Sequence, residues 1–138
     1  MRSNEERRAC LNLIERVEFL TLSMLDEEGG PESRLLFNLR KHRHVCFYPP
    51  TDGFPEDFST YIGTNTASRK VDLIRNEPRV SLYYFDPMTF EGCFIRGTAT
   101  EMHDVSIKTL LWTADWEKYY QGGMEGGDYT ILNFVPQH

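Results

Sequence analysis

The chain has 138 residues, of which 40% are hydrophobic and 26% are charged, a size and balance typical of one compact domain. Its formal net charge of -6 disfavours nucleic acid as a partner, because nucleic acids attract domains with a dense basic face. No apolar run approaches the ~20 residues that a membrane helix needs, and the charged segment Met1–Arg8 lacks the apolar stretch of a secretory signal. We therefore expect one domain over residues 1–138, in the cytoplasm, that binds neither nucleic acid nor a membrane.

Short strands separated by turns dominate the pattern, and helices are few. A capping-box pattern at Ser3 and Glu6 opens an apolar helical face that ends before Phe19. The segments with strand character are 19–25, 33–39, 45–48, 58–62, 79–85, 92–101 and 129–135. Helical spacing is expected after Lys70 up to Asn76, over 103–112, and in one more turn over 116–120. Many strands at short spacing predict a small β-barrel.

The segment from Thr64 to Lys70 joins a predicted strand to a predicted helix. Its hydroxyls and its two cations, Arg69 and Lys70, surround a helix N-terminus, where free N–H groups and the positive end of the helix dipole favour a phosphate. Arg34, at the start of the second strand, could converge on the same point. The alternative is that Ser68 only caps the helix while the two cations are solvated.

The other polar clusters of the sequence give little indication of a functional site. The three cysteines are widely separated without Cys-x-x-Cys spacing, and His42 and His44 have no third ligand in range, so the sequence predicts no metal site. We interpret the basic run from Arg40 to His44 as a solvated turn. No Ser/His/Asp triad or paired carboxylates stand at a plausible site, so the catalytic residues stay unidentified.

The order of the motifs resembles that of the pyridoxamine 5'-phosphate oxidase-like FMN-binding split-barrel proteins, and among them the general-stress-protein branch. The matching features are the Thr64–Lys70 loop, the strand-opening Arg34, the strands 78–84 and 93–101, and the aromatic and glycine pattern from Leu111 to Tyr129. The resemblance covers about Leu13 to Pro136. It implies a mainly β (α+β) fold: a six-stranded antiparallel split β-barrel with flanking short helices, which forms a homodimer and binds FMN at the interface.

The resemblance also implies roles for the second strand. Arg34 would reach the flavin phosphate or the ribityl chain, and Leu35 and Leu36 would present backbone groups to the isoalloxazine ring. An arginine suits this place because its planar guanidinium can grip a phosphate through two parallel hydrogen bonds. From the residue pattern alone, Arg34 could instead pair with the acidic turn Asp26–Glu28 across the hairpin.

The remaining implied contacts come from the loop and from an aromatic ring. The loop residues expected to bind the cofactor are Thr64, Ser68, Arg69 and Lys70. One aromatic ring of the partner subunit would lie against the flavin, and Trp116 is the first choice for this ring. The aromatic cluster from Trp112 to Tyr120 could equally be core or dimer interface.

Two departures from the family pattern bear on the reaction. The true vitamin B6 oxidases carry a substrate-binding lysine where this chain has Leu39, and an arginine-x-histidine segment where it has Phe134–His138. The resemblance therefore implies an FMN-dependent oxidoreductase that acts on an unidentified small molecule, with NAD(P)H as a candidate donor, and not a true pyridoxamine 5'-phosphate oxidase. A non-enzymatic flavin-binding or storage module of the stress-response kind is the alternative, and a barrel that has lost FMN is a third interpretation.

Overall fold

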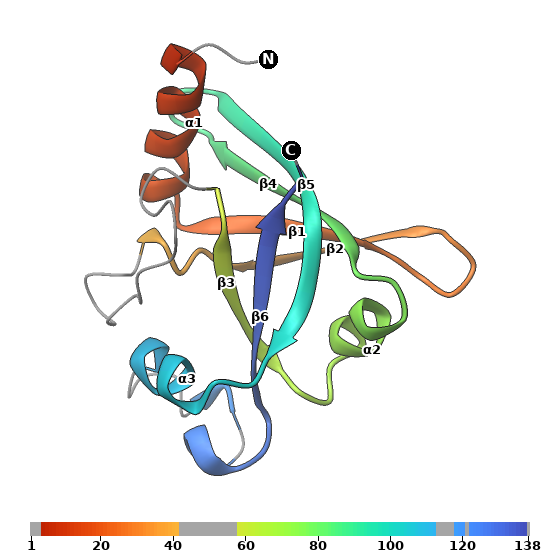
Figure 1. Ribbon diagram of the computed structural model, residues 1–138. Coiled ribbons are helices and arrows are strands. Elements are labelled where there is room, and N and C mark those ends of the chain that lie inside the picture. The colour runs from red at the N-terminus through yellow and green to blue at the C-terminus, as the bar shows by residue number, and fades with distance from the viewer. Residues whose placement is uncertain (1–3, 42–57, 113–117, 121, 138) are drawn as a thin grey trace.

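Six strands form one antiparallel sheet that curls into a split barrel (Figure 1). The computed structural model describes residues 4–41, 58–112, 118–120 and 122–137. The strands are β1 (Phe19–Leu25), β2 (Pro31–Phe37), β3 (Thr60–Asn65), β4 (Arg79–Asp86), β5 (Glu91–Met102) and β6 (Tyr129–Pro136). Their order in the sheet is β2-β1-β4-β5-β6-β3, so β2 and β3 are the two edges. The barrel is split between these edges, which contact each other.

Short helices flank the sheet. They are α1 (Asn4–Arg16), α2 (Arg69–Asn76), α3 (Val105–Leu111) and the 3-10 turn η3 (Gly123–Glu125). Figure 1 shows α1 at one end of the barrel and α3 at the other, with α2 beside the β1–β2 hairpin. No helix in the described ranges is both long enough and apolar enough to cross a membrane.

The core follows from the two-residue alternation of the strands. Leu20, Leu22 and Met24 of β1 point inward, and they pack with buried residues of β4, β5, β6, α1 and α2. Burying one such side chain contributes about 1.5–3 kcal/mol relative to leaving it exposed. A second cluster, which includes Tyr61 and Tyr120, lies where β3 and β6 meet α3.

Apolar side chains also lie on the opposite surface, outside the barrel. Phe19, Leu35, Phe37, Tyr83 and Phe94 are 40–66% exposed, and we call this set the outer sheet face. The strand pairing places them together, because Phe19 lies opposite Phe37 and Tyr83 lies opposite Phe94. An exposed apolar patch of this kind commonly marks an interaction surface.

The predicted fold class is confirmed, and β1 has the predicted bounds. The expected second strand, 33–39, was wrong at both ends, since β2 runs from Pro31 to Phe37. It ends there because the buried amide of Asn38 turns to α1 and donates to the carbonyl oxygens of Ile14 (2.6 Å) and Val17 (2.8 Å). The strand expected over 58–62 runs from Thr60 to Asn65, so Thr64 belongs to β3 and not to the following turn.

The interpretation of the basic run as a solvated turn was wrong for Arg40. Its side chain is fully buried, and its Nη2 donates to Oε1 of Glu15 at 2.8 Å while Nη1 donates to the carbonyl oxygen of Ser59 at 3.2 Å. The chain after β2 packs against the C-terminal end of α1. The buried guanidinium is stable there because it has a carboxylate and a carbonyl oxygen as partners. The described residues leave out His42–His44 of this run, the strand expected over 45–48, the predicted cap at Ser3, and positions 116 and 117 of the expected helical turn.

Candidate functional site

A pocket of about 230 Å³ opens between the edge strands β2 and β3, where the barrel is split. Leu35 and Leu36 line it from β2, and Gly63 and Thr64 line it from β3. Lys70 of α2 is also part of its lining. The split therefore brings β2 into one site with residues of β3 and α2 that lie more than 25 positions further along the chain.

One wall of the pocket is aromatic. The rings of Phe19 and Phe37 stack at 5.6 Å between centroids, and Phe37 meets Tyr119 at 5.9 Å. Tyr119 is held there by Asn65, whose Nδ2 donates to the Tyr119 carbonyl oxygen (2.8 Å) and to Oδ2 of Asp128 (2.7 Å). Each of these three rings is 40–46% exposed. Such a wall offers a stacking surface to a planar ring.

The α2 end of the pocket is positively charged. Ser68 caps the helix by accepting a hydrogen bond from the backbone N–H of Lys70 at 3.1 Å, and the helix dipole adds to the positive potential. Burial, and then the charge of Arg34, lower the pKa of Lys70. Within the described ranges no carboxylate lies at ion-pair distance from the Lys70 ammonium group. An anion placed here would relieve the repulsion between the two cations.

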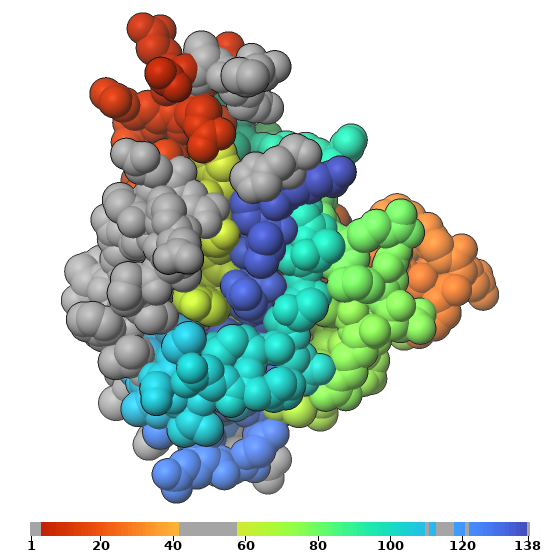
Figure 2. Space-filling model, in the orientation of Figure 1, coloured from red at the N-terminus to blue at the C-terminus, as the bar shows by residue number. Residues whose placement is uncertain are grey.

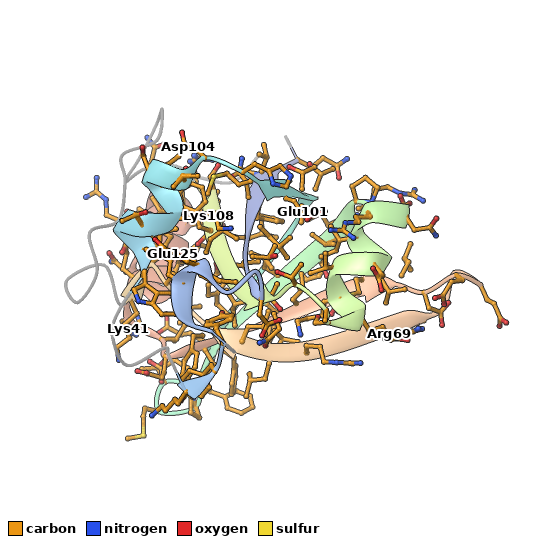
Figure 3. The ribbon with its side chains drawn as sticks, turned by 90° about the horizontal axis from the view of Figure 1, so that it is seen from below. Lys41, Arg69, Glu101, Asp104, Lys108 and Glu125 are labelled. Atoms are coloured by element: carbon orange, nitrogen blue, oxygen red, sulfur yellow. The ribbon has the colours of Figure 1, made fainter. Side chains whose placement is uncertain are left out.

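The structure brings Arg34 and Lys70 together but turns Arg69 elsewhere. The guanidinium of Arg34 donates to the carbonyl oxygen of Ser33 at 2.8 Å and lies 3.4 Å from Oε2 of Glu32. Arg69 faces the β1–β2 hairpin, where it contacts Glu32 at 2.8 Å and Glu27 at 3.1 Å (Figure 3). The acidic turn thus pairs with Arg69, where the sequence had suggested Arg34.

The other predicted residues divide into three groups. Leu35, Leu36 and Thr64 line the pocket. Ser68 caps α2 and lies in an adjacent open hollow with Thr66. Trp116 lies outside the described residues, so its contact with a flavin stays a prediction. In the described part of the chain, no group of three or more His, Cys, Asp or Glu side chains is placed to hold a metal ion.

The sequence did not single out Phe19, Phe37 or Asn65 as site residues. The alternation along β1 and β2 places each phenylalanine on the outer side of its strand. Only the pairing of Phe19 with Phe37 shows that the two rings form a single wall. A signal for Asn65 existed in the sequence, since it stands within the loop that was already assigned to phosphate.

Comparison with known proteins gives consistent matches. A family model described as "Pyridoxamine 5'-phosphate oxidase" matches residues 6–138. No curated protein matches the chain. Among solved structures, a Clostridium acetobutylicum protein related to general stress protein 26 of B. subtilis is 26% identical, with a TM-score of 0.75 over 98% of this chain and 86% of that one.

Two further structures share the fold at lower identity. General stress protein 26 from Bacillus anthracis is 19% identical with a TM-score of 0.73, over 96% of this chain and 89% of that one. A putative pyridoxamine 5'-phosphate oxidase from Listeria innocua is 17% identical with a TM-score of 0.70, over 96% of this chain and 94% of that one.

Proposed function

The chain belongs to the pyridoxamine 5'-phosphate oxidase family, and we propose that it is a flavoprotein that binds FMN in the pocket between β2 and β3. One observation carries the proposal. Leu35, Leu36, Thr64 and Lys70, which the family resemblance assigns to FMN, line a single pocket although they come from three different elements.

The chemistry of this pocket fits the two ends of FMN. Its aromatic and leucine wall suits a planar isoalloxazine ring, and Lys70, Arg34 and the N-terminus of α2 suit a phosphate. Ser68 contributes by fixing the first turn of α2. The contribution of Arg69 depends on whether its carboxylate partners release it.

We further propose that FMN serves a redox reaction on a small molecule, with NAD(P)H as the electron donor. When bound, FMN supplies hydride and electron transfer, and the protein supplies orientation and electrostatics. The aromatic wall would orient the ring and exclude water from one of its faces. Lys70 and Arg34 would anchor the phosphate end and so fix the distance of the ring from β3.

The substrate we propose is not pyridoxamine 5'-phosphate. Leu39, at the position of the substrate-binding lysine of the true oxidases, is 2% exposed and lines the pocket with an apolar side chain. A second phosphate would therefore find no charged partner at this point. Binding a phosphate against an apolar surface costs desolvation without a compensating hydrogen bond.

The size of the pocket supports a site that is shared between two subunits. A volume of about 230 Å³ is below the ~300–1,000 Å³ of most pockets for drug-sized ligands, so the described part of one chain holds only part of FMN. The outer sheet face begins at the aromatic wall of the pocket, through Phe19 and Phe37, and continues across β4 and β5 to Tyr83 and Phe94. A two-fold dimer that buried this face would cover apolar surface and close two sites at once.

Absorbance of the purified protein, with FMN added and unbound flavin removed, tests the proposal. Retention of the flavin bands in the near-ultraviolet and blue is expected, and anaerobic addition of NADH or NADPH should bleach them. A protein that retains no FMN would refute flavin binding. A yellow protein that neither nucleotide bleaches would favour the storage module over the enzyme.

A further inference from the structure

The guanidinium of Arg69 is fully engaged by two carboxylates of the β1–β2 hairpin. Oε1 of Glu32 accepts from Nε (3.1 Å) and Nη2 (2.8 Å), which form one edge of the guanidinium. Glu27 accepts from Nη1 (3.3 Å) and Nη2 (3.1 Å), which form the other edge. An arginine grips a phosphate in the same bidentate way, through one of these two edges. A phosphate can therefore be held bidentately by Arg69 only if a carboxylate leaves.

The hairpin presents these carboxylates without depending on them for its own shape. Oδ1 of Asp26 accepts hydrogen bonds from the N–H groups of Glu28 (2.9 Å) and Gly30 (2.7 Å), and Gly29 adopts the positive φ of 83° that the turn requires. Figure 2 shows the tip of this hairpin projecting beyond α2. The turn should thus keep its shape when Glu27 or Glu28 is made neutral, because Asp26 holds it.

The two carboxylates differ in how firmly they are placed. Glu32 is 22% exposed, stands on β2 and also contacts Arg34, whereas Glu27 is 62% exposed in the turn. Exposed ion pairs contribute little net stability, because solvent and salt screen them. Glu27 is therefore the partner that a phosphate would displace first.

Charge balance gives this arrangement a physical reason. Without a phosphate, Arg34 and Lys70 repel each other beside the N-terminus of α2, where the helix dipole adds further positive potential, and Arg69 is a third cation at this helix end. The hairpin carboxylates neutralise the most exposed of them. Around Arg69 they supply the negative charge that a phosphate would otherwise bring.

We propose that Glu27 and Glu32 are built-in competitors of the FMN phosphate for Arg69, with Glu27 as the one that yields. The inference rests on the proposed function, because it names what sets the affinity of that site. Its consequence is that the protein binds FMN more weakly than its three cations would allow. Arg69 contributes its full contact only after Glu27 has moved away.

The test measures affinity by quenching of flavin fluorescence, for FMN and for riboflavin, which lacks the phosphate. Glu27→Gln should tighten FMN about threefold to tenfold and leave riboflavin unchanged. Glu28→Gln is the matched control, since it removes the same charge from the same turn but has no contact with Arg69 in the described part of the chain. It should change FMN affinity less than about twofold, because solvent and salt screen an exposed charge that has no direct contact.

Arg69→Ala supplies the second measurement. Its loss of FMN affinity should be several-fold larger in the Glu27→Gln background than in the wild type, because only there is the guanidinium available from the start. Any of three results would overturn the inference but leave the proposed function standing. They are equal effects of Glu27→Gln and Glu28→Gln on FMN, weaker FMN binding by Glu27→Gln, and an Arg69→Ala effect that does not depend on the background. Binding of neither flavin by the wild type would refute the proposed function, and the inference with it.

Discussion

Lys70 is the cation on which the phosphate site depends most directly, and Lys70→Met removes its charge while keeping an unbranched apolar stem. The side chain lines the pocket, is half-buried and meets no carboxylate among the described residues. A charge-assisted hydrogen bond to a phosphate in such a place contributes ~1.5–3 kcal/mol. FMN affinity should therefore fall about tenfold to a hundredfold.

The pH dependence gives an independent check on the same residue. Burial and the neighbouring Arg34 hold the pKa of Lys70 below its ordinary value in the free protein, and a bound phosphate would raise it again. The complex then holds the proton more tightly than the free protein does, so binding weakens as the pH rises through the lowered pKa. FMN affinity of the wild type should decline as the pH rises through this lowered pKa, and this part of the decline should be missing in Lys70→Met.

The measurement is a fluorescence titration with FMN and, in parallel, with riboflavin. Riboflavin affinity should not change, because the proposed site places the ring against the aromatic wall and only the phosphate beside Lys70. Lys108→Met is the control, since Lys108 lies on α3 (Figure 3) and is not among the residues that line the pocket. If Lys70→Met binds FMN as tightly as the wild type, or loses riboflavin to the same extent as FMN, the phosphate assignment is wrong.

Substrate choice, assembly and the buried ion pair yield three more predictions. With FMN in excess, oxygen-dependent formation of pyridoxal 5'-phosphate should be negligible, because Leu39 offers no charge to a second phosphate. Turnover near the median enzyme rate of ~10 per second would contradict this. Light scattering of the wild type should give about twice the 16.1 kDa chain mass. Tyr83→Glu, which places a charge on the outer sheet face, should shift the mass to that of one chain. A monomeric wild type with tight FMN binding would exclude the shared site. Glu15→Ala should lower the free energy of unfolding in urea by about 3 kcal/mol, because it leaves the buried Arg40 without this carboxylate. Glu18→Ala, which breaks an exposed pair, should cost less than about 1 kcal/mol, and equal costs would show that burial does not matter here.

Local features of the fold could be predicted from the sequence because they depend on neighbouring residues. Alternation along 19–25 predicted β1 correctly, and the Ser68 cap with the following apolar spacing predicted α2. Each of these patterns depends on residues that lie within about four positions of one another. The overall order of elements, together with its resemblance to a known family, then predicted the split barrel.

Only the tertiary structure decided which residues form the site and which charges pair. Phe37 and Tyr119 are 82 positions apart, and their ring contact depends on the strand register and on the hydrogen bonds of Asn65. Arg69 could have faced the pocket or the hairpin, and its orientation depends on where the hairpin places Glu32 and Glu27. The alternation of apolar residues limits which face of a strand each side chain takes. It does not say which strands pair, or which carboxylate an arginine meets, because those contacts join segments that are remote in the chain.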